Sequence, residues 1–178
     1  MQGHKTMLLL ALAAVCACPM AAEDNAIEKG ESEAVGFAGL ADGNLTMGGA
    51  FGKGVTDKIF AYGELSFLKG DSASFNGVKA SSNAIGFGGG AQYNFNKLFK
   101  SNPRWVPYAG AGLSLFRFSA KSSFGGVSAS ASATDLFLNF GGGLRYYMKP
   151  NWGFRPELMI FAGDGSFIRA TVGLFYQF

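Results

Sequence analysis

Six charged side chains lie at alternating positions of strand-like segments. Three are acids and three are bases, so they could form ion pairs: Glu64, Asp135, Glu157, Arg145, Arg155 and Arg169. If residues 149–151 close a tight hairpin, Arg145 lies opposite Arg155, with Glu157 one step along the same face. Because neighbouring like charges need acidic partners, the pattern predicts an interior charge network. Such a network either fills a narrow interior structurally or lines a gated or selective pore, and both interpretations stay open.

Residues typical of catalytic and metal sites are missing from most of the chain. The single histidine, His4, and both cysteines, Cys16 and Cys18, lie within the first 22 residues. Without them no thiol nucleophile, imidazole base or usual zinc site can form. The segment 86–91 matches the dinucleotide pattern G-x-G-x-x-G/A, but no helical pattern follows it, so its glycines indicate close packing. We predict no enzyme, cofactor or metal, while a hydrolase built from Asp and Glu alone stays open.

The first 22 residues have the pattern of a cleavable signal peptide. His4 and Lys5 precede an apolar run from Met7 to Met20, and two alanines then precede an acidic pair. The run is too short to span a bilayer as a helix, which needs about 20 residues. A retained anchor and a lipidated Cys18 are the alternatives. Residues 23–33 are polar and acidic without a period, which predicts a flexible segment before a domain at 34–178.

Composition narrows the class of that domain. Charged residues make up only 15% of the chain, against about 25% in soluble domains, while the chain holds 27 glycines and 18 phenylalanines. The net charge of +3, without a Lys/Arg stripe, does not favour nucleic acid as a partner. Few charges combined with many aromatics indicate strands with one apolar face.

Alternation with a period of two runs through the whole domain. In the last segment, six apolar residues at even positions from 168 to 178 alternate with residues that include Arg169, Thr171 and Gln177. Similar segments predict eight strands, at 34–41, 45–54, 59–68, 82–95, 105–118, 134–148, 152–162 and 167–178. The apolar faces are continuous and carry charge only near strand ends, at Lys53 and Arg117, which favours a lipid-facing exterior over a soluble barrel. The predicted fold is therefore all-β, an up-and-down antiparallel transmembrane β-barrel of about eight strands.

Connections and aromatic residues indicate how this barrel is oriented. Residues 55–58 and 149–151 are tight turns, whereas 69–81 and 119–133 are longer, rich in Ser, Gly and Ala, and predict outside loops. In this arrangement the tyrosines and tryptophans fall toward the periplasmic rim, where amphipathic rings favour the headgroup zone. The predicted interface aromatics are Tyr93, Trp105, Tyr108, Tyr146 and Trp152.

The motifs and their order resemble those of the small outer-membrane β-barrel domain proteins, similar to OmpA-type barrels and opacity-type porin-like proteins. The resemblance is carried by Val55-Thr-Asp-Lys58, Ala61-Tyr-Gly-Glu-Leu65, Pro107-Tyr-Ala-Gly-Ala-Gly112, Asn139-Phe-Gly-Gly-Gly-Leu-Arg-Tyr-Tyr147, Gly153-Phe-Arg-Pro-Glu157 and Phe178. It implies a terminal strand read by the barrel-assembly machinery, through Leu174, Tyr176 and Phe178. Pro156 departs from a regular strand, because it removes a ladder hydrogen bond, and a local bulge would accommodate it.

These observations predict a non-enzymatic protein of the cell outer membrane, structural or porin-like. Its expected partners are outer-membrane lipids and lipopolysaccharide, together with periplasmic chaperones and the assembly machinery during biogenesis. One alternative is a surface interaction protein, an adhesin acting through residues 69–81 and 119–133. Another is a narrow channel for small solutes. Residues rich in Ser, Ala and Gly identify no external ligand.

Overall fold

The structure, a computed structural model, describes residues 28–75, 78–95, 104–124 and 127–178. The predicted signal peptide at 1–22 and most of the connection at 96–104 lie outside the described residues. Within the described part no helix is long and apolar enough to cross a membrane. The described chain is built from strands, joined by turns.

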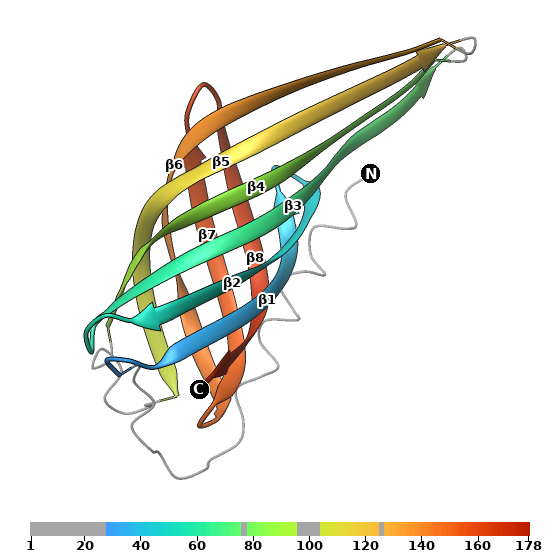
Figure 1. Cartoon of the computed structure of the whole chain (residues 1–178). Helices are drawn as coiled ribbons and strands as arrows, with labels where there is room; N and C mark the ends of the chain where they lie inside the picture. Colours follow the sequence, from blue (N-terminus) through green and yellow to red (C-terminus); the bar gives the residue numbers. More distant parts are fainter. Residues whose placement is uncertain (1–27, 76–77, 96–103, 125–126) are drawn as a thin grey trace.

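Eight strands follow one another along the chain, as the alternation predicts (Figure 1). Their bounds are β1 Ser32–Ala41, β2 Asn44–Gly54, β3 Ile59–Phe75, β4 Val78–Asn94, β5 Trp105–Phe124, β6 Val127–Lys149, β7 Trp152–Ala162 and β8 Ser166–Gln177. Each strand pairs antiparallel with the next, and β1 pairs with β8 from Glu33↔Gln177 to Ala41↔Arg169. The sheet is thus a closed barrel, and the predicted fold class is confirmed.

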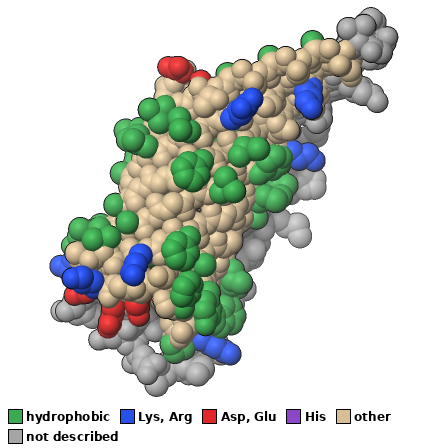
Figure 2. All heavy atoms as spheres, viewed as in Figure 1, with side chains coloured by type: hydrophobic (Ala, Val, Ile, Leu, Met, Phe, Trp, Pro, Cys, Tyr) green, Lys and Arg blue, Asp and Glu red, His purple; other side chains and the backbone are tan. Residues whose placement is uncertain are grey.

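The two faces of the strands are also those that the alternation predicts. In β8 the even-numbered apolar residues are exposed on the outside, with Leu174 at 53% and Ile168 at 51%, while Arg169 and Phe175 on the opposite face are each 1% exposed. Figure 2 shows hydrophobic side chains over the outside of the barrel. An apolar exterior of Leu, Ile, Val and Phe around an interior that buries charged side chains such as Arg169 is the inverse of a soluble barrel and suits a lipid environment.

Short turns close one end of the barrel, here called the turn rim, at residues 55–58 and 150–151. At the other end β1 and β2 are joined through Asp42 and Gly43, which have φ of 46° and 85°. Two consecutive positive φ values are required by the type I′ turn, and its twist matches that of the flanking strands. This connection is therefore a compact hairpin turn.

The structure corrects the two predicted outside loops. Residues 69–75 and 78–81 continue β3 and β4, and residues 119–124 and 127–133 continue β5 and β6, with pairing up to Phe75↔Val78 and Phe124↔Val127. The strands that flank these two hairpins end earlier. The pairing of β2 with β3 ends at Thr46↔Leu68, and the pairing of β7 with β6 ends at Leu138↔Ala162. The two hairpins therefore form a four-stranded sheet, the extension (residues 69–75, 78–83, 117–124 and 127–134), which projects beyond the rest of the barrel (Figure 1).

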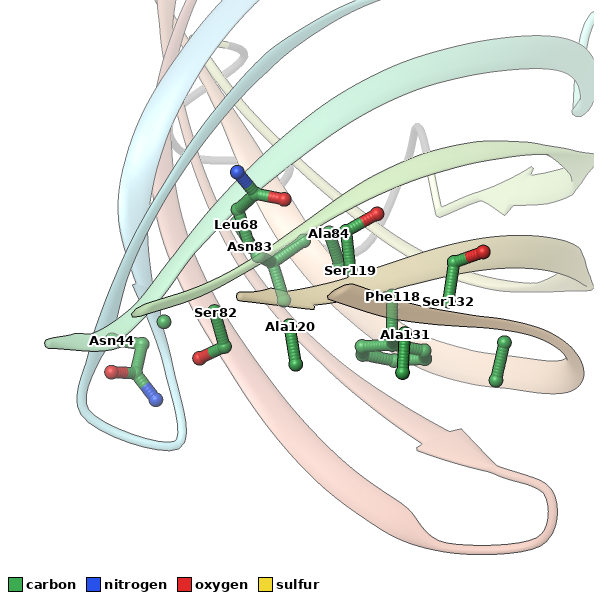
Figure 3. Close-up of a pocket in the computed structure, with 12 residues that line it drawn as sticks. Asn44, Leu68, Ser82, Asn83, Ala84, Phe118, Ser119, Ala120, Ala131 and Ser132 are labelled. Carbon is green, nitrogen blue, oxygen red and sulfur yellow. The ribbon is translucent and has the colours of Figure 1, made fainter. Parts of the chain in front are cut away.

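In the extension the outward face of the sheet is polar, whereas in the barrel it is apolar. In Figure 3, Ala120 and Ala131 point to one side of the sheet, whereas Ser119 and Ser132 point to the other. The alanine side continues the barrel interior, since Phe118 pairs with Ala84, which is only 2% exposed. A cavity of about 400 Å³ lies there, at the mouth of the barrel, among lining residues that include Leu68, Phe118 and the alanines of this sheet. Above the membrane band, polar side chains thus face outward.

The first strand begins earlier than predicted. The segment 23–33 was expected to be flexible, but the structure places Ser32 and Glu33 in β1, with Glu33↔Gln177 and Glu33↔Gly52 as cross-strand partners. Glu33 is 1% exposed and points into the barrel. Its carboxylate needs partners there, because burying an unpaired charge is costly.

Pro156 causes no bulge. It pairs with Val172 of β8, and the β6–β7 register is the same on both sides of it, from Gly143↔Glu157 to Tyr146↔Phe154. The irregularity in this pair of strands lies between Tyr147 and Lys149. The proline therefore costs a local hydrogen bond to β6 without changing which side chains face inward.

The glycine run at 86–91 lies within β4, as its alternation predicts. A Cβ added at Gly86 would collide with the Phe116 ring and with the hydroxyl group of Ser66. Glycine at this position makes room for an interior aromatic ring, and the dinucleotide interpretation has no helix to support it.

Candidate functional site: the charged barrel interior

The charged interior begins where β1 meets β6 and β7 across the lumen. Arg145 donates from Nε to Glu33 Oε2 at 2.7 Å and from Nη2 to Glu33 Oε1 at 3.1 Å. Its remaining donors reach Asn94 Oδ1 and Gln92 Oε1, both at 2.8 Å. Arg145 is 0% exposed, so this set of partners replaces the water that a guanidinium group normally binds.

Arg155 links this first pair to a second carboxylate. It donates from Nη1 to Glu33 Oε1 at 3.0 Å and from Nη2 to Glu157 Oε2 at 2.6 Å. The hydroxyl group of Tyr108 lies between the two: it accepts from Arg155 Nε at 2.7 Å and donates to Glu157 Oε2 at 2.6 Å. A planar guanidinium group makes this bridging possible because it carries five donors in a fixed arrangement.

Arg169 of β8 extends the chain of charges across the interior. It forms a bidentate pair with Glu64 of β3, with Nη2–Oε2 at 2.8 Å and a second contact from Nη1 to Oε1. Its Nη2 also lies 3.4 Å from Glu157 Oε1. Three arginines and three carboxylates are thus joined in sequence, from Arg145 through Glu33, Arg155, Glu157 and Arg169 to Glu64.

Aromatic rings fill the space beside the guanidinium groups. Arg145 lies over the Tyr108 and Phe60 rings, at 4.6 and 5.2 Å from their centroids. Arg169 lies 5.0 Å from both the Phe37 and Phe161 centroids. Ring faces carry partial negative charge, so these contacts stabilise desolvated cations while also occluding the lumen.

A second, apolar layer lies on the extension side of the charges. Phe116 contacts three rings edge-on, with centroids 5.4–5.6 Å away, and Phe161 and Phe167 stack at 4.5 Å. Met159 and Ala84 belong to the same buried cluster. Between the layers, Asn139 donates to the Ser114 hydroxyl group at 2.8 Å. The interior is therefore filled by side chains from a charged layer to an aromatic one, as the width of an eight-stranded barrel allows.

The structure brings together five of the six predicted interior charges and separates the sixth. Asp135 is on the inward face but lies ten residues from Arg145 along β6, on the order of 33 Å at strand spacing. Phe137, which is 4% exposed, lies on the same face between Asp135 and the network. Among the described residues no ion pair joins Asp135 to the arginines, so its place in the predicted network is wrong.

Glu33 is the charged residue that the sequence analysis missed. It lies at the end of a polar, acidic segment, which was therefore predicted to be flexible and not part of a strand. Its spacing of two from Val35, an inward-facing residue that is 7% exposed, was the available signal. The network has equal numbers of acids and bases only because Glu33 takes the place assigned to Asp135.

The predicted interface aromatics divide between two locations. Trp105 and Tyr146 pack against each other on the outside of the turn rim with centroids 4.8 Å apart, Tyr93 is 44% exposed, and Trp152 is half-buried. Tyr108 was placed with them wrongly. It is 3% exposed and faces inward, because β5 residues with even numbers point into the barrel. The predicted assembly residues Leu174, Tyr176 and Phe178 all face outward and are 53–62% exposed.

The arrangement offers little for catalysis. Each carboxylate of the network accepts hydrogen bonds from at least one arginine, and none is left as an unpaired base. The described residues contain no group of three or more His, Cys, Asp or Glu side chains able to hold a metal ion. The geometry is suited to holding the strands together across the lumen.

Comparison with known proteins agrees with this architecture. The family model described as "Outer membrane protein beta-barrel domain" matches residues 7–178. No sequence among the curated proteins matches the chain. Among solved structures, the N-terminal β-barrel domain of Pseudomonas aeruginosa OprF has a TM-score of 0.63 at 19% identity, covering 84% of this chain and 98% of that one.

Two further structures share the fold. Ail, the attachment invasion locus protein of Yersinia pestis, has a TM-score of 0.61 at 19% identity, covering 84% of this chain and 99% of its own. A major outer membrane protein of Thermus thermophilus has a TM-score of 0.64 at 10% identity, with coverages of 83% and 98%. At these identities the likeness is one of fold.

Proposed function

The chain belongs to the outer membrane protein β-barrel domain family, and from this premise we propose that it is a closed, non-conducting barrel with a structural role. It is a protein of the cell outer membrane. The observation that carries the proposal is the continuous chain of ion pairs from Arg145 to Glu64, which crosses the lumen.

Two properties of the interior favour closure over conduction. Every arginine of the network is at most 5% exposed, so little water reaches the charges that a pore would present to ions. The aromatic layer around Phe116 blocks the same lumen a second time, nearer the extension. A permeating ion would have to displace both layers, and breaking one partner out of a buried charge pair costs about 3–5 kcal/mol.

The same observations separate this role from the two remaining alternatives. A narrow solute channel needs a continuous water path, which the buried charges and rings oppose. Catalysis has no support in the described interior, where the carboxylates are paired with arginines. We therefore assign the barrel no enzymatic activity.

A second role, surface contact, is supported by the extension. Paired strands hold residues 69–75, 78–83 and 117–124 in a sheet well beyond the apolar band, so this surface is presented in one conformation. We propose that this end faces the outside of the cell, because it carries the long hairpins, whereas the described connections 55–58 and 150–151 at the opposite end are the short turns expected on the periplasmic side. The closed barrel then serves as the membrane anchor of this surface.

Export and assembly follow from the same proposal. Residues 1–22 act as a cleavable leader, and the outward-facing terminal strand with Leu174, Tyr176 and Phe178 is the segment offered to the assembly machinery. N-terminal sequencing of the protein from outer membranes would locate the cleavage point. A protein retaining its first residues would rule out the leader.

Planar-bilayer conductance of the refolded protein tests closure directly. We expect wild-type protein to show no sustained conductance, and Glu157→Gln to lower the free energy of unfolding while conductance stays low. The physical reason is that Glu157 contacts both Arg155 and Arg169, which would lose a countercharge. Steady wild-type conductance, with Glu157→Gln thermally neutral but altered in ion selectivity, would show instead that these charges line a permeation path.

A further inference from the structure

We propose that the free edge of β6 in the extension pairs with the same edge of a second copy of this chain, held in a facing membrane. The surface, here called the open edge, is the backbone of residues 128–134 on the side away from β5. The inference names a partner for the surface contact proposed above, and it rests on the outward orientation proposed there.

Beside the open edge lies no strand among those that the structure describes. β6 pairs with β5 as far as Phe124↔Val127, whereas its pairing with β7 ends at Leu138↔Ala162. In an antiparallel sheet, one residue in two directs its N–H and C=O groups to each side of its strand. Half of the residues in the open edge therefore direct both groups away from β5, where a further strand can bind them.

The two free edges of the extension differ in how they are protected from pairing. β3 has a register shift against β4 between Lys69 and Ser72, and its sequence carries Lys69 and Asp71. Charges and bulges of this kind hinder an edge strand from pairing with another chain. Residues 128–134 contain only Ser, Ala and Thr, and each of them pairs with β5 in unbroken register. β6 therefore presents the edge that is suited to a further strand.

The sequence of the open edge matches itself when two copies run antiparallel. Its odd-numbered residues are alanines on the inner face of the sheet, and its even-numbered residues carry hydroxyl groups on the outer face (Figure 3). A two-fold axis at Ala131 places alanine beside alanine, and it places Ser130 beside Ser132 of the second copy. Residues 128–134 then allow roughly six to eight backbone hydrogen bonds between the copies.

This match favours a second copy over an unrelated peptide. In strand addition the backbone supplies affinity, while pockets for side chains supply specificity. The open edge carries small, uncharged side chains, which offer a foreign sequence neither a pocket nor a charge to recognise. A second copy needs only the same alternation, and no like charges lie opposite each other along the paired strands.

Strand direction determines where the second copy lies. A two-fold axis perpendicular to a sheet reverses every strand, and with the strands it reverses the barrel from which the sheet projects (Figure 1). The two barrels therefore lie in membranes that face each other. Copies in one membrane point the same way, so β6 could pair antiparallel there only with β3 of a neighbour, whose edge is irregular. Many copies in each membrane act together, which strengthens a weak single contact.

The first experiment measures clustering of vesicles that carry the mature protein, residues 23–178, at physiological salt. Wild-type vesicles should cluster, and Ser130→Lys/Ser132→Lys should reduce clustering to the level of protein-free vesicles, because like charges then lie opposite each other. The control Ser119→Lys/Ser123→Lys adds the same charge to β5, three strand spacings or about 14 Å from its counterpart, where salt screens it. It should cluster as the wild type does. Heat-dependent gel mobility establishes that each variant is folded.

An exchange of charge tests the pairing itself. Vesicles with Ser130→Glu/Ser132→Glu should not cluster alone, but they should cluster with Ser130→Lys/Ser132→Lys vesicles, because each lysine then lies opposite a glutamate. A mixture that stays dispersed would overturn the proposal, and so would equal losses in the β5 control.

A cysteine on the two-fold axis tests the register. Residues 23–178 contain no cysteine, so Ala131→Cys introduces a single thiol. Tagged and untagged Ala131→Cys protein, reconstituted in separate vesicles and mixed under mild oxidation, should form tagged–untagged disulfide dimers. Ala120→Cys is the matched control and should form few, because Ala120 pairs with Ala131 on the same face but one strand further from the axis. Equal crosslinking at both positions, or dimers confined to one vesicle population, would refute the facing arrangement.

The outward orientation is tested by a different measurement. In intact cells a membrane-impermeant maleimide should label Ser130→Cys on the extension. Labelling of cells together with failure of the vesicle tests would keep the outward orientation and overturn the second copy as partner, leaving the edge to a strand of another protein. Labelling only after the outer membrane is opened would refute the orientation, and with it the contact between cells. The closed-lumen proposal is tested by conductance and does not depend on either result.

Discussion

Glu33 and Arg145 are 112 positions apart in the chain, yet they face each other across the barrel with Nε–Oε2 at 2.7 Å and Nη2–Oε1 at 3.1 Å. Their strands, β1 and β6, are not neighbours in the sheet. The pair therefore joins opposite walls of the barrel, which backbone hydrogen bonds between adjacent strands cannot do.

The substitution Glu33→Gln should destabilise the barrel strongly. It leaves Arg145 and Arg155 without the carboxylate they share, and uncompensated buried charge costs about 3–5 kcal/mol. Urea unfolding of the protein in detergent micelles measures the loss. Glu31→Gln, at a half-buried neighbouring position with no ion pair to these arginines among the described residues, is the control and should change stability little. Equal stability of the two variants would mean that the network does not hold the walls together.

The substitution Tyr108→Phe removes a single bridging hydroxyl group. Arg155 Nε would lose its acceptor and Glu157 Oε2 a donor, both at buried positions, so we expect a loss of about 1–3 kcal/mol. Tyr93→Phe makes the same chemical change on the exposed outer face and should be close to neutral. Thermal unfolding followed by gel mobility distinguishes them, and a neutral Tyr108→Phe would contradict the observed bridge.

The substitution Gly153→Ala should be destabilising through steric overlap alone. A Cβ at this position would collide with the backbone carbonyl group of Tyr146, which is fixed by the β6–β7 ladder. Overpacking of this kind costs about 1–3 kcal/mol. At Gly36 a Cβ would meet nothing within 4 Å, so Gly36→Ala is the matched control. The same unfolding measurement applies, and similar values for both glycines would refute the tight contact.

Spin labels should show that the outward face of β6 changes from lipid-exposed in the barrel to water-exposed in the extension. A label at Leu138, which is 53% exposed in the apolar band, should be accessible to oxygen dissolved in the bilayer. A label at Ser130, on the same outward face of the extension, should be accessible to a water-soluble relaxation agent instead. Hydrocarbon accessibility at both positions would place the extension inside the membrane and contradict its polar outer face.

The alternation of apolar and polar residues was sufficient to predict the fold and to predict which side chains face into the barrel and which face out. Alternation with a period of two depends only on the chain itself, because successive side chains of a strand point to opposite sides. It correctly assigned Leu174 to the outside and Arg169 to the inside. It failed for the Ser- and Ala-rich residues 119–133, which were predicted as a loop from their composition, because residues 119–124 pair one by one with residues 127–132.

Which charges meet was decided by closure of the barrel. Sequence spacing gives distances along one strand, but it carries no information about distances across the lumen, which depend on strand number, tilt and register. The sequence by itself determined that acids and arginines face inward, and it placed Asp135 among them. Only the closed sheet, with β1 paired to β8, brings Glu33 to Arg145 and leaves Asp135 on the far side of the aromatic layer. A buried guanidinium group is stabilised by the carboxylate within reach in space, wherever that carboxylate lies in the chain.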